Sequence, residues 1–440
     1  MRPAVPFFPA AILAAAFAPG IPAASAAPWT PPSTVGPAAM ELYRAVSGVS
    51  GAALAAGYGS QTTLAPVAAD GSPGPTREGR TVVDLAAYAD RAVFLRRSSN
   101  LRRVGVSFGD LGARRLGRER VLHRGTAADA ALAVGPGGQT LVALSVDGDD
   151  EDGDELDNAR VRLTWSVDRG HRRWRSQALP GRTDVLDMAV DAHGTAILLL
   201  QRGRIDGAPV TARTLDLRRG RLGKERTLDR PRVDWLWGSI ATDGAGRAVL
   251  TWGAQDGGEE ADRRMVVKAA FRRRGTDRFG ATQTLDRGGA VDRTSGGPYA
   301  AMDAAGNATV AWSQTVAARG TNETYSVPRA ATAVTDGRLG CFRTLLTDGA
   351  VSDAVAAGGT TLVAATGSAQ PSEGAAGAAG VSGVFVRERG SGFAPLEPVT
   401  GDDPRDAEPL DLTAGPGGFR AFWVPGGDDD RLRSAFRPTG

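Results

Sequence analysis

One short pattern occurs seven times along this chain, and each copy reads as a tight turn between two β-strands. The clearest copies are ATDGAGRAVLTW and AMDAAGNATVAW, which end at Trp252 and Trp312. The turns of the seven copies are centred on Asp90, Gly138, Gly194, Gly246, Gly306, Gly359 and Gly418. Successive centres lie 48 to 60 residues apart. A repeat of this length with strands and no helices is typical of a β-propeller or a linear array of β units.

Each copy contains four strands, which we call A to D in chain order, with the turn between A and B. Strand A has small side chains. Strand B is apolar on both faces, as in Ala248, Val249 and Leu250, which indicates a strand packed between two other sheets. Four strands per repeat, separated by Gly and Asp turns, match a propeller blade. The Trp residues recur at one position of strand B, so we interpret them as packing between blades.

The two ends of the chain predict how the ring closes. The seventh copy stops after its C strand, whereas residues 59–66 (GSQTTLAP) resemble a D strand and precede the first A strand. An N-terminal outer strand that completes the last blade removes both free sheet edges. The sequence therefore predicts an all-β fold: a seven-bladed β-propeller of four-stranded antiparallel blades over residues 58–440, closed by that strand. Residues 27–57 are expected to form an N-terminal tail.

Residues 1–26 have the features of a secretory signal peptide. Arg2 supplies the positive start, residues 7–17 are apolar, and Ala24-Ser25-Ala26 is an A-x-A cleavage site. An uncleaved membrane anchor is the alternative, but the apolar run is too short to span a bilayer. With a single Cys the chain forms no internal disulfide. We expect a secreted, extracellular monomer without a membrane span.

The charge balance argues against a nucleic-acid partner. The net charge is +3, because 52 basic residues are nearly balanced by 49 acidic ones. Arginine-rich runs, such as residues 271–274, fall at strand ends and turns. No aromatic residues alternate with them, as they do in proteins that bind single strands. A solvated rim is the simpler interpretation of these arginines.

A family resemblance follows from the repeats. Copies such as AMDAAGNATVAWSQ, followed by an Arg-rich strand and DRFGATQTLD, resemble secreted β-propeller repeat proteins of high-GC bacteria. These are loosely grouped with sialidase-like and WD40-like propellers. The sialidase Asp box (S-x-D-x-G-x-x-W) is absent, since Trp312 stands six residues after Gly306, and no Trp-Asp or Gly-His pair recurs. The resemblance covers residues 59–440 and implies the architecture, without an assigned activity.

One acidic segment is a candidate metal site. Residues 147–157 contain carboxylates around glycines, as a hard cation requires: Asp147, Asp149, Asp150, Asp152 and Asp154. The spacing does not match an EF-hand, because Gly148 occupies the first ligand position and no Glu stands six residues after Gly153. A solvated acidic loop between strands B and C is the alternative. We expect no cofactor, and only weak Ca²⁺ binding or none.

A second acidic feature lies at the start of the A strands. Four of them carry an aspartate six or seven residues before the turn centre, and a fifth opens with Tyr299: Asp84, Asp187, Asp353 and Asp411 are the four. B–C turns, which emerge on the same face as D–A turns, are also acidic. This pattern predicts an acidic binding face around the propeller centre. The alternative is that Asp is simply common at turns and strand entries.

Two classes of function remain. The chain has no H-E-x-x-H, G-x-S-x-G, C-x-x-C or P-loop motif. It consists almost wholly of repeats, and no copy carries a constellation that the others lack. This favours a non-enzymatic binding or scaffold protein that contacts an unknown extracellular protein or glycan through the B–C/D–A face. The alternative is a carbohydrate-active hydrolase or lyase that uses central carboxylates or Tyr299.

Overall fold

The structure is a computed structural model in which every regular element is a β-strand. It describes residues 29–36, 41–58, 62–79, 82–98, 102–112, 116–125, 127–146, 160–168, 170–203, 208–231, 236–256, 264–290, 298–317, 324–333, 337–346, 349–368, 380–400, 410–415, 417–425 and 431–438. Within these residues there is no helix of the length and apolarity needed to cross a membrane.

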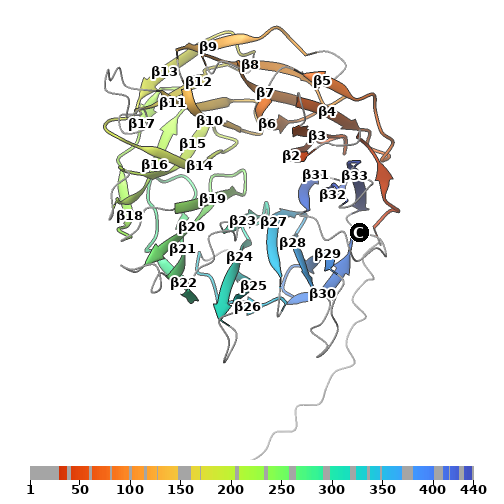
Figure 1. Ribbon diagram of the computed structural model, residues 1–440. Helices are drawn as coiled ribbons and strands as arrows, with labels where there is room; N and C mark the ends of the chain where they lie inside the picture. Colours follow the sequence, from red (N-terminus) through yellow and green to blue (C-terminus); the bar gives the residue numbers. More distant parts are fainter. Residues whose placement is uncertain are drawn as a thin grey trace, which may run out of the picture.

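The strands form eight antiparallel sheets that follow one another around a central axis, with their first strands innermost (Figure 1). We number these blades in chain order and give their strands from the centre outward. Blade 1 contains β2 (Glu41–Ser47), β3 (Ala53–Tyr58), β4 (Thr62–Val67) and β5 (Arg77–Gly79). Blade 2 contains β6 (Val82–Tyr88), β7 (Arg91–Arg97), β8 (Arg103–Asp110) and β9 (Arg120–Arg124). Blade 3 contains β10 (Ala127–Val134), β11 (Thr140–Val146), β12 (Arg160–Ser166) and β13 (Trp174–Ala178).

Blade 4 has a divided outer strand, since two short strands pair with its third. It contains β14 (Asp184–Val190), β15 (Thr195–Gln201), β16 (Val210–Asp216), β17 (Arg221–Leu222) and β18 (Arg226–Asp229). Blade 5 contains β19 (Leu236–Thr242), β20 (Ala248–Asp256), β21 (Arg264–Arg272) and β22 (Gln283–Ala290). Blade 6 contains β23 (Tyr299–Met302), β24 (Ala308–Ala317), β25 (Thr324–Ala333) and β26 (Arg343–Thr344). Blade 7 contains β27 (Ala350–Ala357), β28 (Thr360–Ser368), β29 (Gly380–Arg387) and β30 (Phe393–Pro398). Blade 8 contains β31 (Asp411–Gly415), β32 (Gly418–Trp423), β33 (Arg433–Pro438) and, outermost, β1 (Ser33–Thr34).

The prediction of seven blades is wrong, because the propeller has eight. The missed copy of the repeat is AVSGVSGAALAAGY, in residues 45–58. Its turn closes like that of blade 3: the Gly51 N–H donates to the Gly48 carbonyl, as the Gly138 N–H does to that of Gly135. Two physical features hid this copy. It packs on alanine and glycine with no Trp, and its turn precedes the next by only 39 residues.

The ring is closed by an N-terminal outer strand, but not by the one expected. Of residues 59–66, predicted to close the last blade, residues 62–66 lie instead in β4, the third strand of blade 1. The closing strand is β1, in which Ser33 pairs with Ser434 of β33. Further bonds extend this pairing, since the Thr30 N–H donates to the Phe436 carbonyl and the Val35 N–H to the Leu432 carbonyl, both at 2.8 Å.

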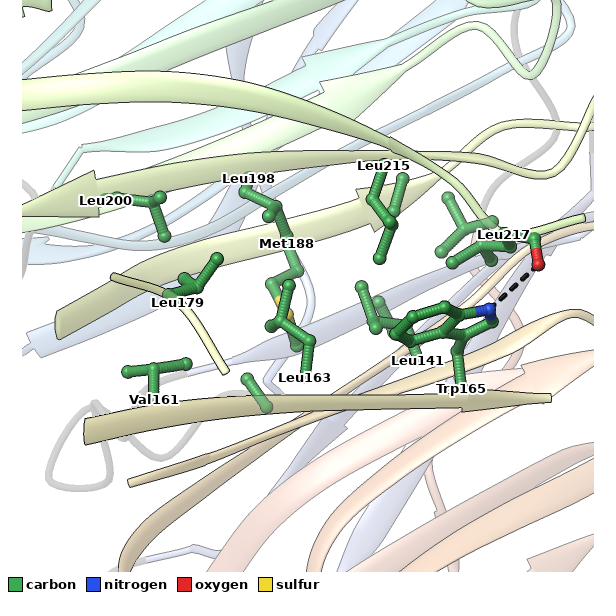
Figure 2. Packing of buried hydrophobic residues seen from close by; sticks show 14 residues of the cluster. Leu141, Val161, Leu163, Trp165, Leu179, Met188, Leu198, Leu200, Leu215 and Leu217 are labelled. Atoms are coloured by element: carbon green, nitrogen blue, oxygen red, sulfur yellow. Dashed lines mark hydrogen bonds between the residues drawn. The ribbon is translucent and has the colours of Figure 1, made fainter. Parts of the chain in front are cut away.

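The core is a series of apolar layers between neighbouring blades, which confirms the packing role predicted for the tryptophans. Figure 2 shows the layer between blades 3 and 4, where Trp165 lies among leucines and its indole N–H donates to the Leu217 carbonyl at 2.8 Å. Trp252 and Trp312 are fully buried in the layers between blades 4 and 5 and between blades 5 and 6. A strand that is apolar on both faces is what such layers require.

The same polar contact, between a tryptophan indole and an aspartate of the preceding blade, occurs in two of these layers. The Trp252 indole donates to Asp229 on the outer strand of the preceding blade at 3.1 Å, and Lys268 Nζ lies 2.7 Å from the same carboxylate. In the next blade the Trp312 indole donates to Asp286 at 3.0 Å, and Arg329 pairs with that carboxylate. Each contact satisfies a buried indole N–H, which would otherwise destabilise the core.

Candidate functional site: the axial ring

One position of the innermost strand recurs around the propeller, as the strand registers show. In blade 4 Asp187 pairs with Leu199, and in blade 5 Ser239 pairs with Thr251; each partner stands five residues after its turn glycine. The same register holds in every other blade except blade 8, where Asp411 pairs with Phe422, four residues after Gly418. Asp411 stands seven residues before its turn glycine, as Asp187 does, and we include it among eight equivalent residues that we call the axial ring: Arg44, Asp84, Ala131, Asp187, Ser239, Tyr299, Asp353 and Asp411.

The five residues predicted to form a binding face around the centre all lie in this ring. Asp84, Asp187, Asp353, Asp411 and Tyr299 occupy the same repeat position, which their distance of six or seven residues from the turn centres had indicated. Their role in binding stays a prediction. Sequence reasoning missed Arg44, because it lies in the segment assigned to a tail. The copy in residues 45–58 would have revealed it.

The ring aspartates connect neighbouring blades through backbone hydrogen bonds. Asp187 accepts the N–H of Met188 on one oxygen at 2.7 Å, and the N–H of Ile240, in the next blade, on the other at 2.6 Å. Asp84 and Asp353 repeat this arrangement, and their bonds to the next blade, with the Leu132 and Leu412 N–H groups, are both 2.8 Å long. Ser239 makes the corresponding bond to the next blade without a charge, since its hydroxyl accepts the Ala300 N–H at 3.2 Å.

A β-bulge directs the side chain at four ring positions. The register shifts immediately before Arg44, Asp84, Asp187 and Asp353. A bulge inserts one unpaired residue and turns the following side chain away from the regular pleat. The ring side chains can therefore reach the adjacent blade. In a regular strand, successive side chains would instead point alternately into the two apolar layers.

The carboxyl groups of Asp353 and Asp411 are hydrogen-bonded to each other. Burial raises the pKa of both, and that of Asp411 lies well above its usual range because the Asp353 charge is also close. Two carboxyl groups in contact cannot both ionise easily, so the pair keeps a proton to a higher pH than an isolated carboxyl group does. Asp411 also accepts the Ala45 N–H at 2.6 Å, which connects blade 8 to blade 1 at the joint where the ring closes.

Arg44 is the one cation of the ring. Its side chain is 52% exposed, and Nη1 lies 3.3 Å from Asp84 Oδ1. Burial raises the pKa of Asp187 to about 6, and the Arg44 charge opposes this rise, as it does at Asp353 and Asp411. The Arg44 guanidinium is therefore close enough to act on carboxyl groups in blades 4, 7 and 8.

The ring is net negative near neutral pH. It contains four carboxyl groups and one guanidinium, and Asp187 is ionised above a pH of about 6. Burial, followed by the nearby charges of Asp353 and Asp411, raises the pKa of Tyr299 to about 12. Tyr299 is therefore a neutral phenol that can donate a hydrogen bond and does not act as a base. A cation or a hydroxyl group is the chemistry that such a ring accepts.

Metal binding has no support in the described part of the chain. No three His, Cys, Asp or Glu side chains there are arranged to hold a metal ion. The candidate Ca²⁺ loop, with Asp147, Asp149, Asp150, Asp152 and Asp154, lies outside the described residues. Weak Ca²⁺ binding at that loop stays a prediction.

No protein-family model matches this chain. No curated protein matches it either. Among solved structures it is similar to the polysaccharide lyase Uly1, with 10% identity and a TM-score of 0.49 over 84% of this chain and 93% of that one. A PL25 ulvan lyase has 8% identity and a TM-score of 0.46, over 93% of this chain and 96% of that one. The β-propeller domain of the Trilobed protease from Pyrococcus furiosus has 10% identity and a TM-score of 0.44, over 81% of this chain and 92% of that one. At these identities and scores the likeness carries no argument about function.

Proposed function

We propose that this chain is a secreted, non-enzymatic binding protein that receives a cationic group of an extracellular partner at the axial ring. We place it with the secreted β-propeller repeat proteins of high-GC bacteria that its repeats resemble. The observation that supports the function is the convergence of four carboxyl groups on one repeat position, opposed by Arg44 alone. Each ring carboxylate oxygen that accepts one backbone N–H retains a lone pair for a ligand.

The geometry favours binding over glycoside hydrolysis. A glycosidase separates its two carboxyl groups by about 5 Å or more, so that a sugar and a water fit between them. Asp353 and Asp411 are instead in hydrogen-bond contact, and each also accepts a backbone N–H from the next blade. Tyr299, the other residue of the enzymatic alternative, stays protonated in the range where a lyase base must ionise.

Arg44 offers the sharpest test, because its charge competes with any cation for the ring. Calorimetric titration at pH 7.5 with a lysine-rich peptide is expected to show binding. Arg44→Gln should tighten it about fivefold, since one like charge is removed from close range. Arg77→Gln, an exposed arginine on the outer strand of the same blade, is the matched control and should change nothing.

Two results would contradict the proposal. One is an unchanged or weaker affinity of the Arg44→Gln protein for the peptide. The other is turnover of any polysaccharide by the purified chain that is abolished by Asp411→Asn, which would establish the enzymatic alternative.

A further inference from the structure

Three successive blades carry an unusual concentration of arginine at one kind of turn. In blades 3, 4 and 5, the turn between the third and outer strands and the start of the outer strand together contain three exposed arginines. We call these nine residues the arginine arc: Arg172, Arg173 and Arg175; Arg218, Arg219 and Arg221; Arg273, Arg274 and Arg278.

The three turns form a continuous surface because they contact one another. Arg175 Nη1 of blade 3 donates to the Arg219 carbonyl of blade 4 at 3.0 Å. The Thr214 hydroxyl of blade 4 donates to Asp277, in the blade 5 turn, at 2.7 Å. Residues that are distant in sequence are therefore joined into one strip along the rim, and its position is set by hydrogen bonds between blades.

Few acidic groups oppose the arc. Each turn contains one aspartate, and two of the three bind the backbone of their own turn. Asp168 accepts the Arg172 N–H at 2.9 Å, and Asp216 accepts the Arg219 N–H at the same distance. Arg219 Nε is 3.7 Å from Asp216, at a side chain that is 80% exposed. With nine guanidinium groups and three carboxylates, the strip carries a net charge of +6.

Other blades show that arginine is no requirement of this turn. The corresponding turn of blade 1, in residues 68–74, has no basic residue and contains Asp70, which accepts the Ser72 N–H. In blade 7 the turn has Glu388 beside Arg389. Blade 2 does have arginines in this turn, at Arg114, Arg115 and Arg118, so the basic turns belong to the neighbouring blades 2 to 5 and are absent from blade 1.

The chemistry of the arc selects a polyanion without apolar groups. Trp174, beside the arc, is half-buried and has the Arg120 guanidinium 5.7 Å from its ring, so it offers no open face for a nucleobase. The large apolar side chains exposed in the described residues, Val49 and Phe342, lie in blades 1 and 6, away from the arc, so nothing there would insert into a bilayer. Guanidinium forks match carboxylate and sulfate groups in a bidentate manner.

We propose that the arginine arc binds an anionic polysaccharide, whose carboxylate or sulfate groups follow the rim across blades 3 to 5. The surface is separate from the axial ring, and the two sites take ligands of opposite charge. A linear polymer with an acidic group on successive sugars could contact all three turns at once. Its affinity should depend strongly on salt, because binding releases the counterions of both surfaces.

The test uses the full protein with heparin as the sulfated probe, polygalacturonate as the carboxylated probe and dextran as the neutral one. The variant Arg173→Gln/Arg218→Gln/Arg274→Gln removes one arginine from each turn. Its matched control, Arg77→Gln/Arg343→Gln/Arg389→Gln, removes three exposed arginines from blades 1, 6 and 7. The arc variant should lose about tenfold in affinity for an anionic probe and show a weaker salt dependence. The control should stay within about twofold of the wild type, on the same principle.

Three outcomes would overturn the proposal. Equal losses in both variants would mean that net charge alone drives binding. Tighter binding of single-stranded DNA or of phosphatidylglycerol vesicles than of either polysaccharide would identify another class of partner. No binding of either anionic polysaccharide at low salt would remove the site. The lysine-rich peptide bound at the axial ring reports separately on the proposed function, and its affinity should not change in the arc variant.

Discussion

The axial ring and the arginine arc are both clusters of charged residues at equivalent positions of the repeat, but their hydrogen bonds differ. Ring aspartates accept backbone N–H groups from the neighbouring blade, as Asp187 does from Ile240. Arc arginines are exposed, and the contacts between their turns involve the backbone of Arg219 and the side chain of Asp277. The ring aspartates thus hold neighbouring blades together in addition to the binding role that we propose for them, whereas the arc arginines are exposed. Substitutions should separate these two roles.

The largest effect on stability is expected at the closing joint of the ring. Asp411→Ala removes the acceptor of the Ala45 N–H and the partner of Asp353. Because buried polar groups are left unpaired, the free energy of unfolding should fall by about 2 to 3 kcal/mol in urea denaturation.

Asp411→Asn is the matched variant for this joint. Its amide oxygen can accept the Ala45 N–H, and its NH₂ can donate to Asp353. We expect the Asn protein to unfold at nearly the wild-type urea concentration at pH 8. If Asn is as damaging as Ala, a hydrogen bond between these two side chains does not stabilise the joint.

A smaller effect is expected in the pH dependence that Asp187 confers. Burial raises its pKa from 3.8 to about 6, so the folded state binds more protons than the unfolded state between these values. The stabilisation that the proton on Asp187 gives the folded state is therefore complete below about pH 4 and is lost as the pH rises through 6. Relative to Asp187→Asn, the wild type should lose about 1 to 2 kcal/mol over this window. Parallel stability curves for the two proteins, measured in urea from pH 4 to 7, would contradict this.

The smallest effect on stability is expected in the arc. The three arginines replaced in Arg173→Gln/Arg218→Gln/Arg274→Gln are exposed, so the free energy of unfolding should change by about 0.5 kcal/mol or less. Thermal melting at low and high salt measures this. A large loss of stability would show that the arc, like the ring, is structural.

The repeat pattern predicted most of the architecture because it records local physics. Strands apolar on both faces, Gly turns and buried tryptophans identified seven of the eight blades. The missed blade shows where this method fails: alanines and glycines pack between blades as well as larger residues do, but they leave little signal in the sequence. The same omission misplaced the closing strand, since residues 62–67 have the composition of an outer strand and only pairing with β3 shows that they are not one.

The sequence by itself determined the all-β repeat and the equal placement of Asp84, Asp187, Asp353, Asp411 and Tyr299, because spacing from a turn fixes position within a strand. Tertiary structure alone decided what these residues contact. The contact between Asp353 and Asp411, the position of Arg44 near them, and the joining of nine arginines into one strip all depend on how separate blades come together. Such contacts join residues up to several hundred positions apart, as between Ala45 and Asp411, and no local pattern encodes them.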